Sequence, residues 1–343
     1  MSERPVRLGL IGCGDVAFER HLPTIAASAD VRLIATCDRD QERAARAALE
    51  SGTAVATTAA AEVFGNPAID AVIIATSPWV TPDLTIAALR AGKDVLCEKP
   101  MALSLAKAAE VREAEAASGR IVQVGFVLRH GPLFSTLRRW IAEDRLGAPL
   151  SFRISIFDEI WDPVGAPEHY ARIMATLEHG APCVHDGAHT MDHLHYLTGS
   201  HATRLVSWGQ KTRPEFPRAN YNLAVIGFAN GDTARVEIGW FMPDFPAGEW
   251  NIVGPKGIAT FCLHERSVTL RSECGEETVA LDEDWIPSCF RYQLAAFVEA
   301  VRSRVPPQAG VSAGLTSLAL CQAFERGMDV PFHAIDVTYE RDA

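Results

Sequence analysis

The chain has 343 residues, 48% of them apolar and 22% charged, which is ordinary globular composition and enough length for two domains. Its net charge of −11, without a block of lysine or arginine, argues against a nucleic-acid surface and favours a small-molecule substrate. Eight cysteines without a CxxC pair, and no apolar run of leader or membrane length, predict a cytoplasmic protein that does not associate with membranes.

The chain opens with a pattern typical of a dinucleotide-binding turn. Residues 6–11 are an apolar run that predicts a buried parallel strand, and residues 12–17 follow it as GxGxxA. Gly12 permits a tight turn, Gly14 lets backbone amides approach a pyrophosphate, and Ala17 keeps the next helix close to the sheet. The start of that helix would face the phosphates with N–H groups and a partial positive charge. The cofactor contacts expected here are Gly12, Gly14, Asp15, Val16 and Ala17.

A second strand, expected over residues 31–38, ends on the carboxylate of Asp38. This acid lies about 20 residues beyond the glycine turn, where a carboxylate accepts from a ribose 2′-hydroxyl and repels a 2′-phosphate. The cofactor is therefore expected to be NAD. Arg39 could pair with a 2′-phosphate, so NADP stays open as an alternative. The strand, turn, helix and acid together favour cofactor binding over an ordinary flexible turn.

Strands and helices continue to alternate up to residue 125. Strands are expected at residues 71–76, 94–98 and 121–125, and helices at 44–49, at 81–91 before Gly92, and after a cap at Ser104. Such alternation predicts an α/β fold, a doubly wound parallel (Rossmann) sheet that binds ligands at the carboxyl ends of its strands. The residues at these ends that are expected to contact the cofactor are Thr76, Ser77, Pro78, Glu98 and Lys99.

From residue 150 the chain alternates polar and apolar residues, as half-buried strands do. Strands are expected at residues 151–157, 221–228, 233–240, 249–253, 260–263 and 268–271, with a hairpin turn at Asn230-Gly231. A helix over residues 290–304 carries one apolar stripe and is expected to pack on this sheet or on the first domain. We therefore expect a Rossmann domain over residues 1–126 and an α+β domain with an open, mainly antiparallel sheet over residues 127–343.

The open sheet predicts an oligomer. Helices cover one face of such a sheet, so the other face needs a cover, and a twofold copy of the chain is the simplest one. The second domain is therefore expected to bind substrate and to form a homodimer or homotetramer.

Several motifs together resemble the Gfo/Idh/MocA family of oxidoreductases. The motifs are Gly12-Cys13-Gly14, Asp38, Ala91-Gly92-Lys93, Glu98-Lys99-Pro100, Arg145-Leu146-Gly147, Asp186-Gly187-Ala188-His189, Phe228-Ala229-Asn230-Gly231 and Val253-Gly254-Pro255-Lys256-Gly257. The resemblance spans essentially the whole chain and implies NAD(P)-dependent oxidation or reduction of sugars, inositols or related polyols. Thr81 stands where family members often carry histidine, and residues 77–80 and 179–182 depart from the family pattern. The substrate therefore stays open.

Lys99 is the first candidate for proton transfer. Moving a hydride from an alcohol carbon to nicotinamide needs a base for the hydroxyl proton and a group that steadies the oxyanion. Lys99 follows a buried strand and precedes Pro100, which rigidifies the backbone near the cofactor. A partly desolvated lysine gives up its proton more readily than one in water. The alternative is a surface lysine paired with Glu98, and position and resemblance favour the catalytic or substrate-binding role.

Asp186 and His189 form the second candidate constellation. They are three residues apart and hence neighbours on a helix, where a carboxylate can orient an imidazole that acts as a base. Gly187 between them suggests close approach by another group. The resemblance implies that an aspartate and a histidine of this motif act at the substrate, and we assign these roles to Asp186 and His189. Arg129, after the last Rossmann strand, is a further candidate substrate contact.

Other interpretations of the histidines and of the function stay open. His185, His189 and His193 span about 12 Å of helix axis, which is too far for all three to bind one zinc ion. No metal is therefore expected, unless two of these histidines form a site that residues elsewhere in the chain complete. His193 and His195 are expected to be solvated or packing residues. The leading function is an NAD(P)-dependent dehydrogenase or reductase acting on CH–OH groups. The alternatives are a non-catalytic NAD-sensing regulator and an NAD-dependent glycoside-cleaving enzyme of the same fold.

Overall fold

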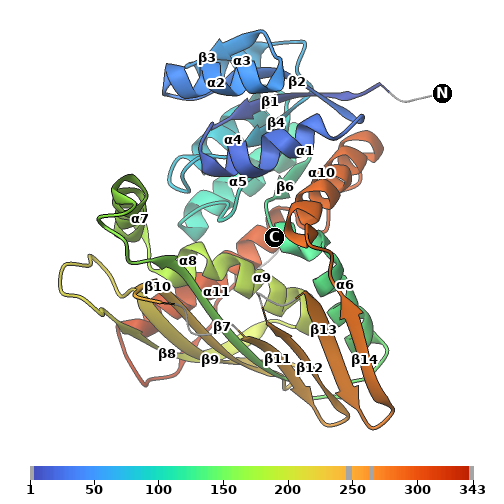
Figure 1. Cartoon of the computed structure of the whole chain (residues 1–343), viewed down its shortest axis with the longest axis vertical. Helices are drawn as coiled ribbons and strands as arrows, with labels where there is room; N and C mark the ends of the chain where they lie inside the picture. Colours follow the sequence, from blue (N-terminus) through green and yellow to red (C-terminus); the bar gives the residue numbers. More distant parts are fainter. Residues whose placement is uncertain (1–3, 245–248, 263–265, 340–343) are drawn as a thin grey trace. The chain divides into compact units, whose positions relative to one another are not determined.

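The computed structural model of the chain describes residues 4–244, 249–262 and 266–339 (Figure 1). The chain divides into two compact units, the first comprising Met1–Gly131 and Ile286–Leu315 and the second comprising Pro132–Trp285 and Thr316–Ala343. The chain thus returns to the first unit late in the sequence. The division at residues 126 and 127 stays a prediction.

The described part of the first unit contains a six-stranded, fully parallel sheet in the order β3-β2-β1-β4-β5-β6. The strands are β1 (Val6–Ile11), β2 (Val31–Cys37), β3 (Val55–Thr57), β4 (Ala71–Ile74), β5 (Asp94–Cys97) and β6 (Val122–Val124). The order reverses between β1 and β4, and doubly wound sheets bind their ligands at this switch point. The predicted Rossmann sheet is confirmed.

Helices join these strands and cover the sheet. They are η1 (Ala17–His21), which is a π-turn, α1 (Leu22–Ala26), α2 (Gln41–Ser51), α3 (Ala60–Gly65), α4 (Thr81–Arg90), α5 (Leu105–Ser118), the 3₁₀ turn η2 (Val127–His130) and α10 (Trp285–Ser303). The predicted cap of α5 is confirmed, because Ser104 accepts a hydrogen bond from the backbone of Lys107 at 3.2 Å. The stripe of α10 lies in the first unit, where Phe297 and Val298 share a core with Leu8. The sequence had left that choice of partner open.

The described part of the second unit contains a nine-stranded sheet in the order β14-β13-β12-β11-β7-β10-β9-β8-β15. The strands are β7 (Ser151–Ile160), β8 (Ala202–Gln210), β9 (Tyr221–Phe228), β10 (Thr233–Met242), β11 (Glu249–Gly254), β12 (Gly257–Cys262), β13 (Ser267–Ser272), β14 (Gly275–Ala280) and β15 (Ile335–Asp336). Within the described residues, β7 and β10 pair in parallel and every other pair is antiparallel. The mainly antiparallel sheet is confirmed, and residue 263, the predicted end of one strand, lies outside the described residues.

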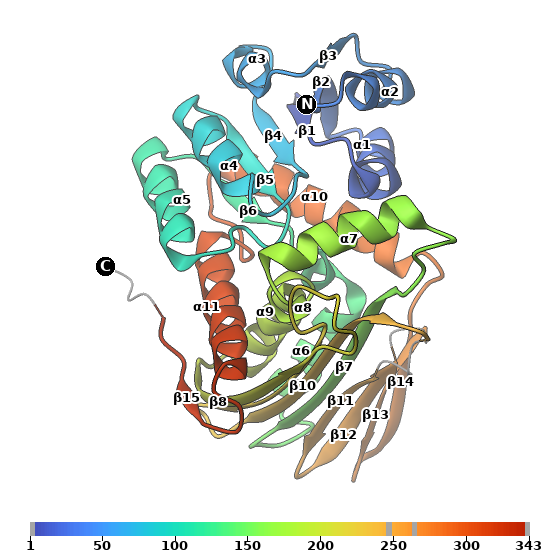
Figure 2. The same ribbon diagram turned by 90° about the vertical axis from the view of Figure 1, so that its left-hand side faces the viewer.

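One face of this sheet is covered by helices, as Figure 2 shows for α6, α8, α9 and α11. The helices of the second unit are α6 (Pro132–Ala142), α7 (Pro167–His179), α8 (Pro182–His185), α9 (Gly187–Thr198) and α11 (Val311–Met328), of which the part from Thr316 onward belongs to this unit. Strand β9 shows the result, because Ala224 and Ile226 are buried while Val225 between them is 54% exposed. The predicted hairpin at Asn230-Gly231 is confirmed, with Gly231 at φ +89° and its N–H bonded to the carbonyl of Phe228 at 3.0 Å.

Candidate active site

The glycine turn lies at the switch point of the first sheet. Gly12 has φ +89°, and a Cβ there would lie 2.2 Å from the carbonyl oxygen of Ala75, the residue that follows β4. A side chain is therefore excluded by two separate constraints. At Gly14 the opposite holds, because a Cβ would meet none of the described atoms within 4 Å. The turn is thus closed against the sheet and open at Gly14, which fits a backbone that a diphosphate approaches.

Asp38 is fixed beside this turn. Its Oδ2 accepts a hydrogen bond from the N–H of Cys13 at 2.7 Å, and its Oδ1 accepts one from the N–H of Asp40 at 2.9 Å. Each carboxylate oxygen can accept a second bond, so the group retains the capacity to receive ribose hydroxyls. Arg39, the residue that keeps NADP open, is exposed. Asp38 therefore has the place and the acceptors that the NAD prediction requires.

The turn after β4 is organised by Thr81, the first residue of α4. This side chain is fully buried, and its hydroxyl lies 3.1 Å from the carbonyl oxygen of Thr76 and 3.2 Å from that of Ser77. The two threonine hydroxyls are themselves 3.0 Å apart. Thr81, which replaces the histidine frequent in the resembled family, therefore stabilises the turn formed by Thr76, Ser77 and Pro78, the predicted cofactor contacts.

Glu98 and Lys99 form the turn after β5, at the same edge of the sheet as the glycine turn. The N–H of Glu98 still bonds to the carbonyl of Ile74 in β4 at 2.9 Å. The Glu98 carboxylate faces His21, with 2.8 Å between Oε1 and Nε2 of the imidazole, and its Oε2 accepts from the backbone N–H of Lys99 at 3.3 Å. Sequence reasoning missed His21, whose signal was a histidine in the helix that follows the GxGxxA turn.

Arg129 lies in η2 and is 8% exposed. Its Nη1 donates to the carbonyl oxygen of Gln308 at 3.0 Å, in the segment between α10 and α11 that belongs to the same unit. This bond shows a structural task for the guanidinium. Its predicted role as a substrate contact remains a prediction.

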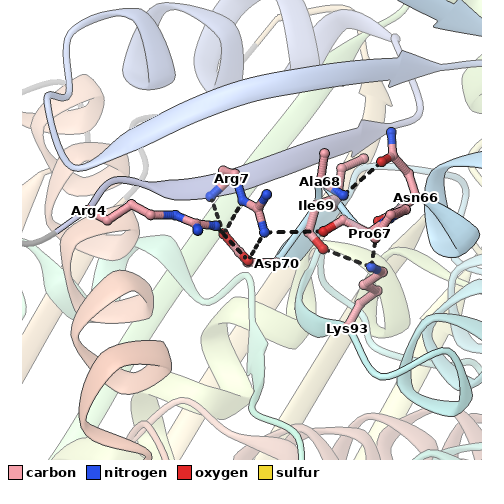
Figure 3. A network of polar contacts seen from close by, with 8 residues as sticks. All are labelled: Arg4, Arg7, Asn66, Pro67, Ala68, Ile69, Asp70 and Lys93. Carbon is pink, nitrogen blue, oxygen red and sulfur yellow. Dashed lines mark hydrogen bonds and ion pairs between the residues drawn. The ribbon is translucent and has the colours of Figure 1, made fainter.

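At the amino ends of the strands of the first sheet, Figure 3 shows a network of polar contacts that includes Lys93, the last residue of the Ala-Gly-Lys motif. Lys93 directly precedes β5, is 7% exposed, and donates from Nζ to the carbonyl oxygens of Asn66 at 2.8 Å and Ile69 at 2.7 Å. Beside it, Asp70 accepts from Arg7, with 2.6 Å between Nη2 and Oδ1. Lys93 thus stabilises the approach to β4 at the amino ends of the strands, away from the predicted cofactor site.

In the second unit, Asp186 lies where α8 ends and α9 begins. Its Oδ2 accepts a hydrogen bond from the indole N–H of Trp240 at 2.7 Å, and the ring of His185 stacks on the same indole with 5.5 Å between centroids. The expected close approach at Gly187 is confirmed, because a Cβ there would lie 3.0 Å from Cδ1 of Ile238. Trp240 of β10 therefore orients the carboxylate of Asp186, to which we assign a contact with the substrate.

Asp186 and His189 are also distinguished by their exposure. Residues 181–194 are all described, and every one of them other than Asp186 and His189 is buried. His193 was expected to be either solvated or a packing residue. It is a packing residue, because it is buried and its ring stacks on that of Phe134 with 3.8 Å between centroids. No three His, Cys, Asp or Glu side chains among the described residues are grouped so that they could hold a metal ion. The two predicted residues are thus the partly exposed ones in this segment.

A further polar cluster lies at the end of β7 and was not predicted. His169 contacts the carboxylate of Glu159 through Nε2, and Arg172 donates to Nδ1 of the same histidine at 2.7 Å. Burial raises the pKa of Glu159, the contact with His169 opposes that shift, and the nearby charge of Asp186 adds to it. Glu159 therefore belongs to the electrostatic surroundings of Asp186. Because its partners lie on a different element, no local sequence pattern indicated it.

Comparisons with known proteins agree with this arrangement. Residues 6–126 match the family described as "Oxidoreductase family, NAD-binding Rossmann fold", and residues 134–260 match the "GFO/IDH/MocA C-terminal domain". The chain is 28% identical over 322 residues to a 1,5-anhydro-D-fructose reductase of Ensifer adhaerens, covering 91% of this chain and 93% of the relative. It is 25% identical over 339 residues to the scyllo-inositol 2-dehydrogenase (NAD(+)) of Bacillus subtilis (strain 168), covering 96% of each chain.

A solved structure shows the same fold. The myo-inositol 2-dehydrogenase from Lactobacillus plantarum superposes with a TM-score of 0.84 at 20% identity, covering 98% of this chain and all of the other. None of the helices in the described residues is long and apolar enough to cross a membrane. The chain belongs to the Gfo/Idh/MocA family of oxidoreductases, and its first unit is the NAD-binding Rossmann fold of that family.

Proposed function

We propose that this oxidoreductase uses NAD to transfer a hydride to or from a CH–OH carbon of an inositol, a sugar or a related polyol. The observation that carries the proposal is the position of Lys99 on the turn after β5, at the sheet edge that also bears the glycine turn and Asp38. The named relatives, a sugar reductase and inositol dehydrogenases, support the substrate class.

In this proposal, different residues bind the cofactor, transfer the proton and bind the substrate. Bound NAD supplies or accepts the hydride. The backbone at Gly12 and Gly14 and the start of the following helix receive the diphosphate, while the carboxylate of Asp38 accepts from the ribose hydroxyls. We assign the hydroxyl proton to Lys99, and His189 is the second candidate for this role. Asp186, oriented by the indole of Trp240, accepts from a substrate hydroxyl.

The experiment is a panel of inositols, sugars and sugar acids, each assayed for reduction of NAD and of NADP by absorbance of the reduced nicotinamide. With a substrate in hand, Lys99→Ala is expected to lower kcat by at least about 100-fold, because the loss of a general acid or base costs that much. Binding of NAD, measured by calorimetry, should stay within about twofold because the diphosphate and ribose contacts lie elsewhere.

The matched control is Lys107→Ala. Lys107 is a surface lysine of the same unit, paired with Asp83 and Glu110, and its loss should leave turnover unchanged. An unchanged rate in Lys99→Ala would refute the role of Lys99. Binding of NAD without turnover of any compound in the panel would favour a regulator. Cofactor that copurifies and never exchanges during cleavage of a glycoside would favour the glycoside-cleaving alternative.

A further inference from the structure

His21 is placed by an irregular turn of the helix that begins at the glycine turn. It ends the π-turn η1 (Ala17–His21), which has one residue more per hydrogen-bonded ring than an α-helix. One extra residue rotates every later side chain by about 100°, since an α-helix has 3.6 residues per turn. The imidazole is 3% exposed and meets the ring of Phe290 edge-on, with 5.6 Å between centroids. The π-turn therefore sets the direction of a side chain that then has little freedom.

Glu98 is held from four sides. Its backbone N–H bonds to Ile74 at 2.9 Å, its Oε1 lies 2.8 Å from Nε2 of His21, and its Oε2 accepts from the N–H of Lys99 at 3.3 Å. On the fourth side is Gly125, where a Cβ would lie 2.7 Å from Oε2. The absence of a side chain at Gly125 leaves the space that the carboxylate occupies. One carboxylate thus links the helix of the glycine turn to the backbone of Lys99.

We infer that His21 and Glu98 are a positioning pair that holds the Lys99 turn against the cofactor-loop helix. The pair lies within the first unit and uses the imidazole Nε2 and both carboxylate oxygens. His21 contacts Oε1 of this carboxylate, and the N–H of Lys99 bonds to Oε2. Without His21 the carboxylate could rotate, and its hydrogen bond to the N–H of Lys99 would weaken. The inference rests on the proposed role of Lys99 in proton transfer. It assigns no contact with substrate or cofactor to His21.

The test compares two amide replacements with an apolar one. In His21→Gln the amide nitrogen lies near the position of Nε2, whereas in His21→Asn it lies near that of Nδ1. We expect His21→Leu and His21→Asn to lower kcat at least tenfold while the Kd of NAD and the KM of substrate change less than twofold. His21→Gln should recover most of kcat. Hydrogen exchange of the peptide containing residues 98–101 should be faster in the Leu and Asn variants and near wild-type in the Gln variant.

The outcomes separate this inference from the proposed function. Normal kcat and normal exchange in His21→Leu would overturn the pair, and a parallel loss of NAD affinity and kcat would show a merely structural role. If His21→Leu does not fold, Glu98→Gln, which keeps the shape and removes the charge, is expected to show the same split between kcat and KM. The exchange measurement needs no turnover, so it tests the pair even if Lys99→Ala shows that Lys99 is not catalytic.

Discussion

Asp38 illustrates how one residue serves the structure and the ligand together. Two backbone N–H groups, from Cys13 and Asp40, already bond to its carboxylate. These bonds hold the acid at the end of β2 against the glycine turn, and they also fix the negative charge at the place where a 2′-phosphate would have to lie. The preference for NAD that we propose therefore depends on the charge of Asp38 as well as on its acceptors.

Replacement of Asp38 by Ser should weaken NAD binding roughly tenfold or more, because a hydrogen bond to a charged group contributes about 1.5–3 kcal/mol. Binding of NADP should weaken less or improve, since the repulsion of the 2′-phosphate is removed. Calorimetry gives the Kd of each cofactor, and the ratio of the Kd of NAD to that of NADP in the variant and in the wild type tests the prediction. Asp38→Asn keeps the shape without the charge and serves as the control. An equal loss for NAD and NADP would contradict the role and indicate a collapsed turn.

Among the elements of the first unit, β1 and the approach to β4 are joined by Asp70. The carboxylate accepts from the Arg7 side chain at 2.6 and 2.9 Å and from the Arg7 backbone at 3.0 Å. The hydrogen bond from the Arg7 side chain is the main reason that the pKa of Asp70 falls to about 2, against an ordinary 3.8. The charged carboxylate is therefore favoured in the folded state.

Asp70→Asn should lower the stability of the protein at pH 7 by about 1 kcal/mol, a modest figure because the carboxylate is 33% exposed and solvent screens it. The pKa of Asp70 is lower in the folded state, so its stabilisation is complete above pH 3.8 and is lost as pH falls towards 2. Urea unfolding of both proteins at pH 7, 5 and 3 should show a constant difference that then shrinks. Asp83→Asn, at an exposed carboxylate, is the control. A difference that grows as the pH falls would contradict the assignment.

The elements themselves were predicted unevenly, for physical reasons. The strand at residues 71–74 is apolar throughout, the strand at 94–97 is apolar after its first residue, and α10 carries a regular stripe, so local pattern sufficed. Strand β14 has no buried residue and β8 mixes polar and apolar positions without strict alternation, so neither gave a periodic signal. The π-turn η1 has no composition that marks it. It is recognised only from the backbone of the folded chain.

For the whole molecule, the outer face of the second sheet is the feature that remains to be explained. Three large apolar side chains there, Trp208, Val225 and Ile258, are 41%, 54% and 43% exposed. We continue to predict that a second copy of the chain covers this face, because isolated sheets with exposed apolar side chains favour association.

Val225→Lys should therefore convert a dimer or tetramer into a smaller species, since a lysine buried in the predicted interface must lose its hydration. Light scattering after size exclusion measures the mass directly. Val305→Lys is the matched control, because Val305 is 62% exposed but lies in the first unit, and it should not change the mass. A wild-type protein with the mass of a single chain would contradict the prediction.

The sequence by itself determined the alternation of strands and helices, the glycine turn, the acid at the end of β2 and the candidates Lys99, Asp186 and His189. The alternation, the turn and the acid depend on periodicity and turn chemistry along the chain, and the three candidates depend on their motifs together with the resemblance to the family. Only the tertiary structure decided that Trp240 binds Asp186, that α10 packs on the first sheet, and that His21 binds Glu98. Such partners lie tens to hundreds of positions apart. Strand order and register bring these residues into contact, and no local sequence pattern predicts such a contact.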